Sequence, residues 1–237
     1  MFDDELLQAF VSGFFGYGSF AAPYWFVGME EGGGETAEDI ALRLRAWEAR
    51  GKSELEDVVE YHLAIGVSKH FDERGVLQPT WNKLIRILLS AMGESPETER
   101  VRAFQRTEWG RPQGTSCLTE LLPLPSPGVD RWLHFAEHSK LPYLMSRAAY
   151  TEHVRPQGVV QLATKVAEYR PRAVVFYGLQ YLPSWQAIAG SGFEATSLAG
   201  TYACRRDGTL YLATRHPAAT GVSNAYFHSV GRLIREG

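Results

Sequence analysis

Four short apolar runs, separated by stretches of helical periodicity, dominate this sequence and limit the folds open to it. The runs are rich in aromatic and β-branched residues and cover residues 24–27, 116–122, 173–177 and 209–214. Strands that alternate with helices pair in parallel through crossover connections, and continuous apolar runs suit strands covered on both faces. The sequence therefore predicts an α/β fold, a three-layer α/β/α sandwich with a central four-stranded, mainly parallel sheet.

No repeat or low-complexity linker divides the chain, so we expect a single domain over residues 1–237. A helical excursion at about residues 35–114 separates the first two predicted strands. Ser95-Pro96 resembles a helix start, because serine caps helices and proline suits the first turn. Apolar residues at helical spacing predict further helices over residues 81–92, 157–169 and 224–235.

Two other helix starts are indicated by pairs of polar residues at capping spacing. Thr36 is followed by Asp39, and Ser53 is followed by Glu56. In such a pair each side chain accepts a hydrogen bond from the other residue's backbone N–H. We therefore expect one helix to begin after each pair.

The charge of the chain argues against indiscriminate binding to nucleic acids. The net charge is −3, and sequence-independent affinity for DNA comes from cations that replace phosphate counterions. Arg205, Arg206 and Arg215 nevertheless cluster near the C-terminus, while acidic residues concentrate between residues 30 and 60. Such clusters are compatible with solvated helix faces or with a local surface that faces DNA.

Composition also bears on location and cofactors. No apolar stretch approaches the ~20 residues that span a bilayer, and residues 1–13 carry acidic side chains where a leader peptide would be basic. We therefore expect a soluble cytoplasmic protein without membrane contact, associated with the nucleoid if it acts on DNA. With only Cys117 and Cys204, the chain alone cannot build a four-thiolate metal site. We expect two free thiols and neither metal nor cofactor.

Four sequence blocks resemble motifs of the uracil-DNA glycosylase superfamily. They are Phe-Val-Gly-Met-Glu-Glu-Gly-Gly-Gly at 26–34, Cys-Leu-Thr-Glu-Leu-Leu-Pro at 117–123, Ala-Val-Val-Phe-Tyr-Gly at 173–178 and Leu-Ala-Thr-Arg-His-Pro-Ala-Ala at 212–219. Their order and spacing match that superfamily from Tyr24 to the end of the chain. The resemblance implies a ligand cleft at the carboxyl ends of the strands, between Gly28–Gly34 and Arg215–Pro217.

The resemblance also implies a reaction, hydrolysis of the N-glycosidic bond of a flipped, damaged or modified base in DNA, as in base excision repair. Breaking this bond places positive charge on the sugar and negative charge on the departing base. Glu30 stands where the superfamily carries Asp or Asn, so we expect it to stabilise the sugar cation or orient the attacking water. His216 stands where a histidine donates to the leaving base. Further substrate contacts are expected from Gly28, Met29, Glu31, Glu120, Arg215 and Pro217.

Glu120 departs from the superfamily pattern in a way that bears on the substrate. Related enzymes place Asn here, whose amide donates to O4 of uracil and accepts from N3–H. An ionised glutamate can only accept, so we expect a base edge with adjacent N–H donors, such as that of guanine, in place of uracil. The alternatives are that Glu120 stands one residue out of register with the superfamily position, or that it forms a salt bridge with an arginine such as Arg111.

The stacking and duplex-wedging residues of the superfamily have no clear counterparts. Glu31 replaces the usual proline, and the later Pro-Phe is absent. The candidates for a ring that stacks on the base are Phe14, Phe15, Tyr17 and Phe20, which are also typical core residues. Val222 is the candidate for a side chain that inserts into DNA, unless its loop simply caps the last helix.

Two alternative functions remain open at this point. The protein could be a catalytically weak or silent binder of nucleic acids or nucleotides, which the departures at Glu31 and Glu120 favour. It could also hydrolyse free nucleosides or nucleotides, which the acidic net charge favours. The spacing of His134 and His138 is compatible with two metal ligands, but no third ligand is recognisable, and solvent-exposed histidines account for it as well.

Overall fold

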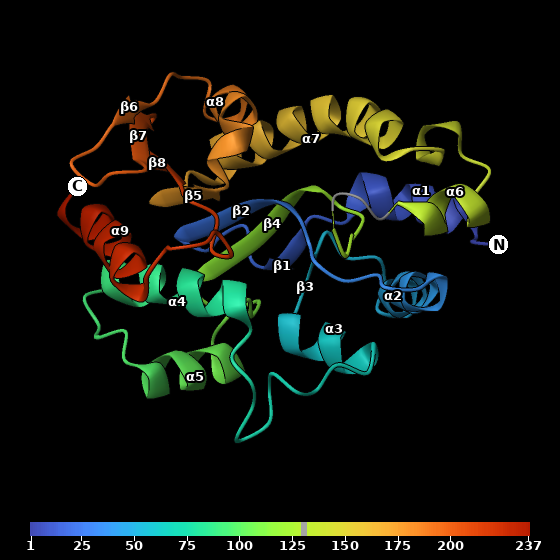
Figure 1. The fold of residues 1–237 in the computed structure, drawn as a ribbon, viewed down its shortest axis with the longest axis horizontal. Helices are drawn as coiled ribbons and strands as arrows, with labels where there is room; N and C mark the ends of the chain where they lie inside the picture. Colours follow the sequence, from blue (N-terminus) through green and yellow to red (C-terminus); the bar gives the residue numbers. More distant parts are fainter. Residues whose placement is uncertain (129–131) are drawn as a thin grey trace.

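The computed structural model describes residues 1–128 and 132–237 and shows an α/β fold, with one mixed sheet between helices on both faces (Figure 1). The strands are β1 (Gly16–Gly18), β2 (Tyr24–Glu30), β3 (Leu55–Glu56), β4 (Ser116–Leu122), β5 (Ala173–Tyr177), β6 (Glu194–Ala195), β7 (Thr201–Arg206) and β8 (Thr209–Thr214). The helices are α1 (Asp4–Gly13), α2 (Ala37–Ala49), α3 (Val58–Ala64), α4 (Pro79–Ala91), α5 (Thr98–Thr107), α6 (Leu133–His138), α7 (Arg147–Tyr169), α8 (Leu182–Ala189) and α9 (Asn224–Glu236), with 3-10 turns at Pro142–Leu144 and Leu179–Tyr181.

The four predicted runs are the four central strands of the sheet. Strands β4, β2, β5 and β8 are neighbours in this order and pair in parallel, so their carboxyl ends share one edge. The expected total of four was too small, because within the described residues the sheet has eight strands in the order β3-β1-β4-β2-β5-β8-β7-β6. The additional strands lie at the two edges, where they are short, as in β3 and β6, or pair antiparallel to the central strands, as in β1 and β7.

The edge strands escaped prediction because they lack an apolar run. Strand β1 is Gly-Tyr-Gly, and its first glycine, Gly16, has φ 138°. A Cβ atom there would lie 2.0 Å from the carbonyl oxygen of Leu118 on β4. Only glycine permits this close approach of two backbones, and hydrophobicity carries no signal for it.

One of the two capping predictions is confirmed and the other is wrong. Thr36 and Asp39 form the expected reciprocal cap at the start of α2. Residues 55–56, however, form strand β3 beside β1, and the Glu56 carboxylate accepts a hydrogen bond from Arg50 at 2.8 Å. The following helix, α3, is capped by Asp57 instead.

The remaining helix predictions differ from the structure mainly in their starts. Helix α5 begins at Thr98, after the N-cap residue Glu97, and not at Ser95-Pro96. Helix α7 begins at Arg147, ten residues before its predicted start at 157, and contains Pro156. Helices α4 and α9 agree with prediction to within two residues and pack against each other.

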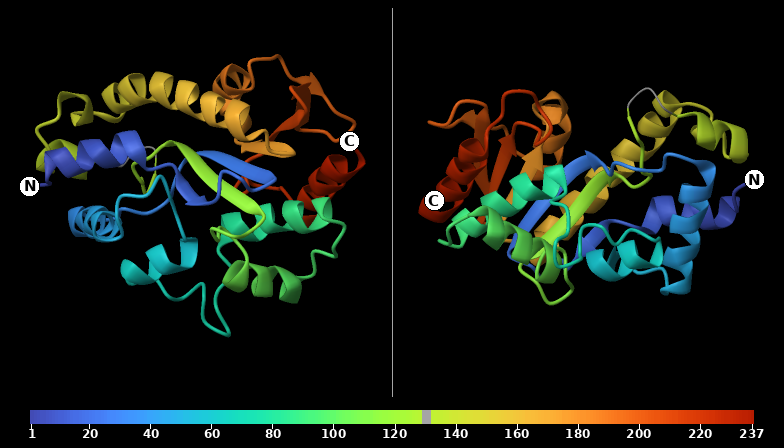
Figure 2. Two further views of the ribbon diagram at one scale, coloured as in Figure 1. Left: turned by 180° about the vertical axis from the view of Figure 1, so that it is seen from behind. Right: turned by 60° about the horizontal axis from the view of Figure 1, so that its bottom comes forward.

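The two faces of the sheet carry different parts of the chain. Helices α7 and α8 cover one face, and α3, α4, α5 and α9 lie on the other (Figures 1 and 2). The excursion between β2 and β4 thus supplies most of the second layer, with β3 as its one contribution to the sheet among the described residues. Cys117 is buried in β4 and Cys204 is half-buried in β7, both as free thiols. In the described parts of the chain, none of the helices has the length and apolar character to cross a bilayer.

Candidate functional site

A cavity of 390 Å³ opens where strands β2 and β4 end and where the excursion folds back over the sheet. Its polar side chains come from the sheet and from the excursion. Tyr17, Glu120 and Tyr177 lie on the sheet, Glu31 follows β2, and Arg43 and His62 come from α2 and α3. Its aromatic walls include Phe14, Phe15, Phe26, Trp81 and Trp109. The cavity therefore combines apolar walls with a few convergent polar groups, as ligand sites usually do.

Glu31 is the most strongly held acidic group of the cavity. Its carboxylate accepts a hydrogen bond from the Tyr17 hydroxyl at 2.9 Å and one from Arg43 Nη1 at 3.3 Å, and His62 Nε2 lies 3.6 Å away. Burial alone would raise the pKa of Glu31, but the charge of Arg43, with His62 and Tyr17, lowers this pKa to about 2. The cavity thus contains a carboxylate that is ionised at neutral pH.

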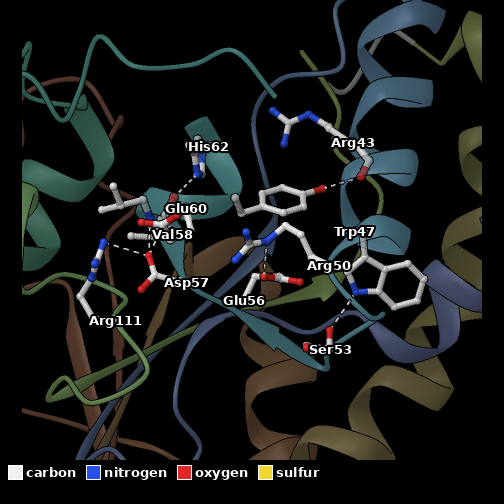
Figure 3. A network of polar contacts seen from close by, with 12 residues as sticks. Arg43, Trp47, Arg50, Ser53, Glu56, Asp57, Val58, Glu60, His62 and Arg111 are labelled. Atoms are coloured by element: carbon white, nitrogen blue, oxygen red, sulfur yellow. Dashed lines mark hydrogen bonds and ion pairs between the residues drawn. The ribbon is translucent and has the colours of Figure 1, made fainter. Parts of the chain in front are cut away.

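A second layer of contacts fixes the helices that present Arg43 and His62 (Figure 3). The Tyr61 hydroxyl donates to the backbone carbonyl of Arg43 at 3.0 Å, which joins α3 to α2. His62 Nδ1 lies 2.7 Å from the carbonyl of Val58 one turn earlier. Arg111 binds Asp57 at 2.9 Å, at the start of α3. Arg111 is therefore engaged away from Glu120, and the salt bridge considered for that pair is not formed.

Glu120 lines the same cavity in very different surroundings. The Tyr177 hydroxyl donates to its Oε1 at 2.7 Å, whereas Oε2 is buried and has no hydrogen-bond partner among the described residues. Burial raises the pKa of Glu120 to about 8, and the charges of Glu31 and Glu30 act in the same direction. The surroundings of Glu120 thus favour its neutral form over the ionised form assumed from the sequence.

Gly28 makes room for this carboxyl–hydroxyl pair. A Cβ atom on Gly28 would lie 2.2 Å from Glu120 Oε2 and 2.3 Å from the Tyr177 hydroxyl oxygen. The glycine of the first motif thus allows the side chains of β4 and β5 to meet above β2. Gly28 was predicted to contact the substrate, and its position beside Glu120 and Tyr177 is compatible with that prediction.

Glu30 lies outside the cavity. Its carboxylate forms an ion pair with Arg147 at the start of α7, on the other side of the sheet from Arg43. Successive strand residues point to opposite faces, so Glu30 and Glu31 cannot both face the cavity. Met29 is buried and also does not line the cavity. Of the two adjacent glutamates, the structure brings Glu31 to the polar cluster.

The second predicted lip of the cleft, residues 215–217 after β8, does not line the cavity. The ring of His216 lies 5.6 Å from that of Tyr177, centroid to centroid. Its Nδ1 accepts a hydrogen bond from the Ala218 N–H at 3.1 Å, so the proton of the neutral ring is on Nε2. Burial lowers the pKa of His216, which favours this neutral form. His216 therefore carries an N–H donor on Nε2.

The other predicted contacts at this lip are less central. The Arg215 side chain is exposed and its guanidinium lies 5.9 Å from the centre of the Tyr226 ring. Pro217 is buried. Val222 is half-buried and packs against the hydrophobic core. Of the ring candidates, Phe14, Phe15 and Tyr17 line the cavity, whereas Phe20 packs against Trp25 and Tyr169.

Several cavity residues were missed from the sequence. Arg43, His62 and Trp81 lie on helices of the excursion and carry no motif, whereas Tyr177 ends a predicted strand and could have been noticed there. The two histidines whose spacing is compatible with metal ligation contact backbone carbonyls, since His134 Nε2 lies 2.7 Å from the Glu35 carbonyl and His138 Nδ1 lies 3.1 Å from that of His134. Across residues 1–128 and 132–237, no three His, Cys, Asp or Glu side chains gather into a metal site.

No protein-family model matches the chain, and no curated protein sequence matches it significantly. Its function is therefore inferred from the site.

Proposed function

We propose that this protein hydrolyses the N-glycosidic bond of a flipped, damaged or modified base in DNA, and that Glu31 has the role first expected for Glu30. The observation that carries the proposal is the ionised Glu31 carboxylate, held by Arg43 in a partly apolar cavity at the carboxyl ends of parallel strands. Glu120 and Tyr177 line the same cavity, and the ring of His216 lies 5.6 Å from that of Tyr177. The order of the sequence motifs is the second support.

Glu31 and His216 have different roles in the proposed reaction. As the glycosidic bond breaks, its electron pair leaves with the base and the sugar becomes an oxocarbenium-like cation. Glu31 stabilises that cation by its charge. Because its pKa is about 2, it is a poor proton acceptor at neutral pH. An attacking water forms the new bond to the sugar carbon and releases its proton to solvent, while His216 Nε2–H donates to the departing base.

The cavity is large enough for a flipped base. At ~30 Å³ for each water molecule, a volume of 390 Å³ holds about 13 waters. Covalently bonded atoms pack more closely than separate waters, so a pyrimidine or a purine fits. Phe14, Phe15 and Trp81 supply aromatic surfaces against which a base can pack.

The direct test is single-turnover base release from oligonucleotides that contain uracil, hypoxanthine, xanthine or alkylated bases. Glu31→Gln should slow release by roughly 100-fold or more, because it removes the charge that faces the sugar. Glu30→Gln is the matched control, and it should retain release per folded molecule. Folded Glu31→Gln protein with unchanged activity, or loss of activity only in Glu30→Gln, would contradict the assignment.

A hydrolase of free nucleosides or nucleotides is the second candidate. The net charge of −3 gives the chain no excess of cations with which to hold a polyanion such as DNA. Release of bases from nucleosides but not from oligonucleotides would select this candidate. Binding to duplex DNA without release from any substrate would instead identify a silent binder.

A further inference from the structure

The segment between α3 and α4, residues 65–78, brings His70 to the wall of the cavity. Helix α5 holds this segment through Gln105, whose side chain is fully buried. The Gln105 amide donates to the carbonyl oxygens of His70 and Val76 at 2.9 and 3.1 Å. Its Oε1 accepts from the backbone N–H of Gln78 at 2.9 Å. The backbone on both sides of His70 is therefore fixed to a neighbouring helix.

His70 is separated from Glu31 by one side chain, that of His62. The rings of His70 and His62 both pack edge-on against Trp81, at 5.7 and 5.3 Å between centroids. His62 Nε2 in turn lies 3.6 Å from the Glu31 carboxylate. His70 thus belongs to the part of the cavity in which Glu31 lies.

The contacts of the His70 ring determine which of its nitrogens carries the proton. Nδ1 lies 2.8 Å from the carbonyl oxygen of Val76, which can only accept, so the proton of the neutral ring is on Nδ1. Nε2 then has a lone pair. This atom has no hydrogen-bond partner among the described residues and, unlike Glu120 Oε2, is not enclosed. Nε2 of His70 is therefore an accessible basic nitrogen on the cavity wall.

The charges around His70 favour its neutral form. Burial lowers the pKa of His70, and positive charge on Lys69 and His62 acts in the same direction, against the bond to the carbonyl. From α5, Arg102 and Arg106 bind backbone carbonyls of the same segment. No carboxylate of the described residues forms an ion pair with His70. The ring therefore keeps its Nε2 lone pair at neutral pH.

We propose that His70 is the general base of the reaction, the group that takes up the proton of the attacking water. The inference rests on the proposed function and supplies the proton acceptor that Glu31 does not provide. As the water oxygen bonds to the sugar carbon, a water proton moves to His70 Nε2 and the glycosidic electron pair leaves with the base. The imidazolium then gives this proton to solvent, and the base anion takes up a proton from solvent.

The first test needs neither a variant nor a substrate. Long-range nitrogen-15 to proton correlation spectra of the wild-type protein at pH 7.5 should show the His70 proton on Nδ1 and the lone pair on Nε2. A ring protonated on Nε2, or on both nitrogens, would overturn the inference because it leaves no basic nitrogen in the cavity.

The second test is single-turnover base release by His70→Asn from the substrate that the wild type cleaves fastest. The asparagine amide can donate to the Val76 carbonyl as Nδ1–H does, but it has no basic nitrogen. Release at pH 7.5 should slow by about 100-fold or more. His153→Asn changes an exposed histidine on α7 and is the matched control, which should release bases like the wild type.

The pH profile separates a base from a residue that only shapes the segment. Because the pKa of His70 is lowered from 6.5, wild-type release should begin to fall below pH 6.5, by about tenfold for each pH unit once the ring is protonated. This acid limb should be absent from the residual activity of His70→Asn. Persistence of the limb in the folded variant would overturn the inference.

The outcomes distinguish this inference from the proposed function. If the wild type releases bases and folded His70→Asn does so at the same rate, the role of His70 fails and the proposed hydrolysis stands. If the wild type releases no base from any oligonucleotide or nucleoside, the proposed hydrolysis fails, and the role of His70 fails with it.

Discussion

Glu31 and Glu120 line the same cavity, yet the protein treats these two carboxyl groups in opposite ways. Glu31 faces Arg43 and His62 from the excursion and accepts a hydrogen bond from Tyr17, so its pKa falls to about 2. Glu120 reaches from β4 across β2 to Tyr177 on β5, has no ion pair with a cation among the described residues, and has a pKa raised to about 8. Both groups are removed from water, so the difference comes from their neighbours.

The largest effect on stability is expected when Arg43, the cation that faces Glu31, is replaced. Arg43→Met leaves the Glu31 charge in the cavity without its main partner, and breaking one half of a buried pair costs about 3–5 kcal/mol of unfolding free energy. Chemical denaturation at pH 7 measures this. Arg45→Met, an exposed position on the same helix, is the control and should change stability by less than about 0.5 kcal/mol. Equal stability of the two variants would mean that Arg43 does not hold Glu31.

The dependence of stability on pH should show the two glutamates separately. The unfolded chain releases the Glu120 proton near pH 4.5 and the folded protein only near pH 8, so stability from this group is fully present below 4.5 and is lost as the pH rises to 8. For Glu31, whose folded pKa is about 2, stability is present above 4.5 and is lost as the pH falls toward 2.

Glu120→Gln should therefore remove the decline between pH 4.5 and pH 8. The decline amounts to about 3 kcal/mol, at ~1.4 kcal/mol for each pH unit and reduced for partial solvent contact. Denaturation midpoints of wild type and variant at half-unit pH steps provide the comparison. Parallel curves for the two proteins over this range would show that Glu120 titrates normally.

Gly28→Ala should selectively disturb the packing of Glu120 against Tyr177. Its Cβ would lie 2.2 Å from Glu120 Oε2 and 2.3 Å from the Tyr177 hydroxyl oxygen, and forced overpacking of this kind costs about 1–3 kcal/mol. Gly32→Ala is the control, because a Cβ at Gly32 meets no atom within 4 Å. Thermal and chemical unfolding of both variants measure the effect. If Gly28→Ala does not change the stability, Glu120 and Tyr177 do not pack over Gly28.

The smallest effect is expected from Tyr177→Phe, which removes a single hydrogen bond to Glu120. Loss of that bond should cost about 1 kcal/mol and raise the pKa of Glu120 further, because the hydroxyl favours the charged form. Tyr202→Phe on β7 serves as the matched control. An unchanged midpoint of the Glu120 titration in Tyr177→Phe would exclude the hydroxyl as its partner.

The same contrast shows what the sequence could predict. The four central strands, the cap at Thr36 and helices α4 and α9 follow from local apolar pattern and capping chemistry, which the sequence carries directly. The choice between Glu30 and Glu31 does not, because a change of one residue exchanges the two faces of a strand. That choice depends on which cation each carboxylate meets, Arg147 on α7 or Arg43 on α2.

The failure at Ser53–Glu56 has a related cause. A capping pattern competes there with strand pairing to β1 and with the Arg50 ion pair, both of which arise only in the folded chain. The state of Glu120 was also out of reach, since the type of residue is visible in the sequence but its burial and lack of a counter-charge are not.

The measurement that bears most directly on the central claim is a carbon-13 NMR titration of the glutamate side-chain carboxyl carbons, with Glu31→Gln and Glu120→Gln used to assign the two resonances. We predict that the Glu31 carboxylate stays ionised until the pH approaches 2, and that Glu120 stays neutral until the pH approaches 8. Two resonances that both titrate near pH 4.5 would contradict the division between the two sides of the cavity and the functions inferred from it.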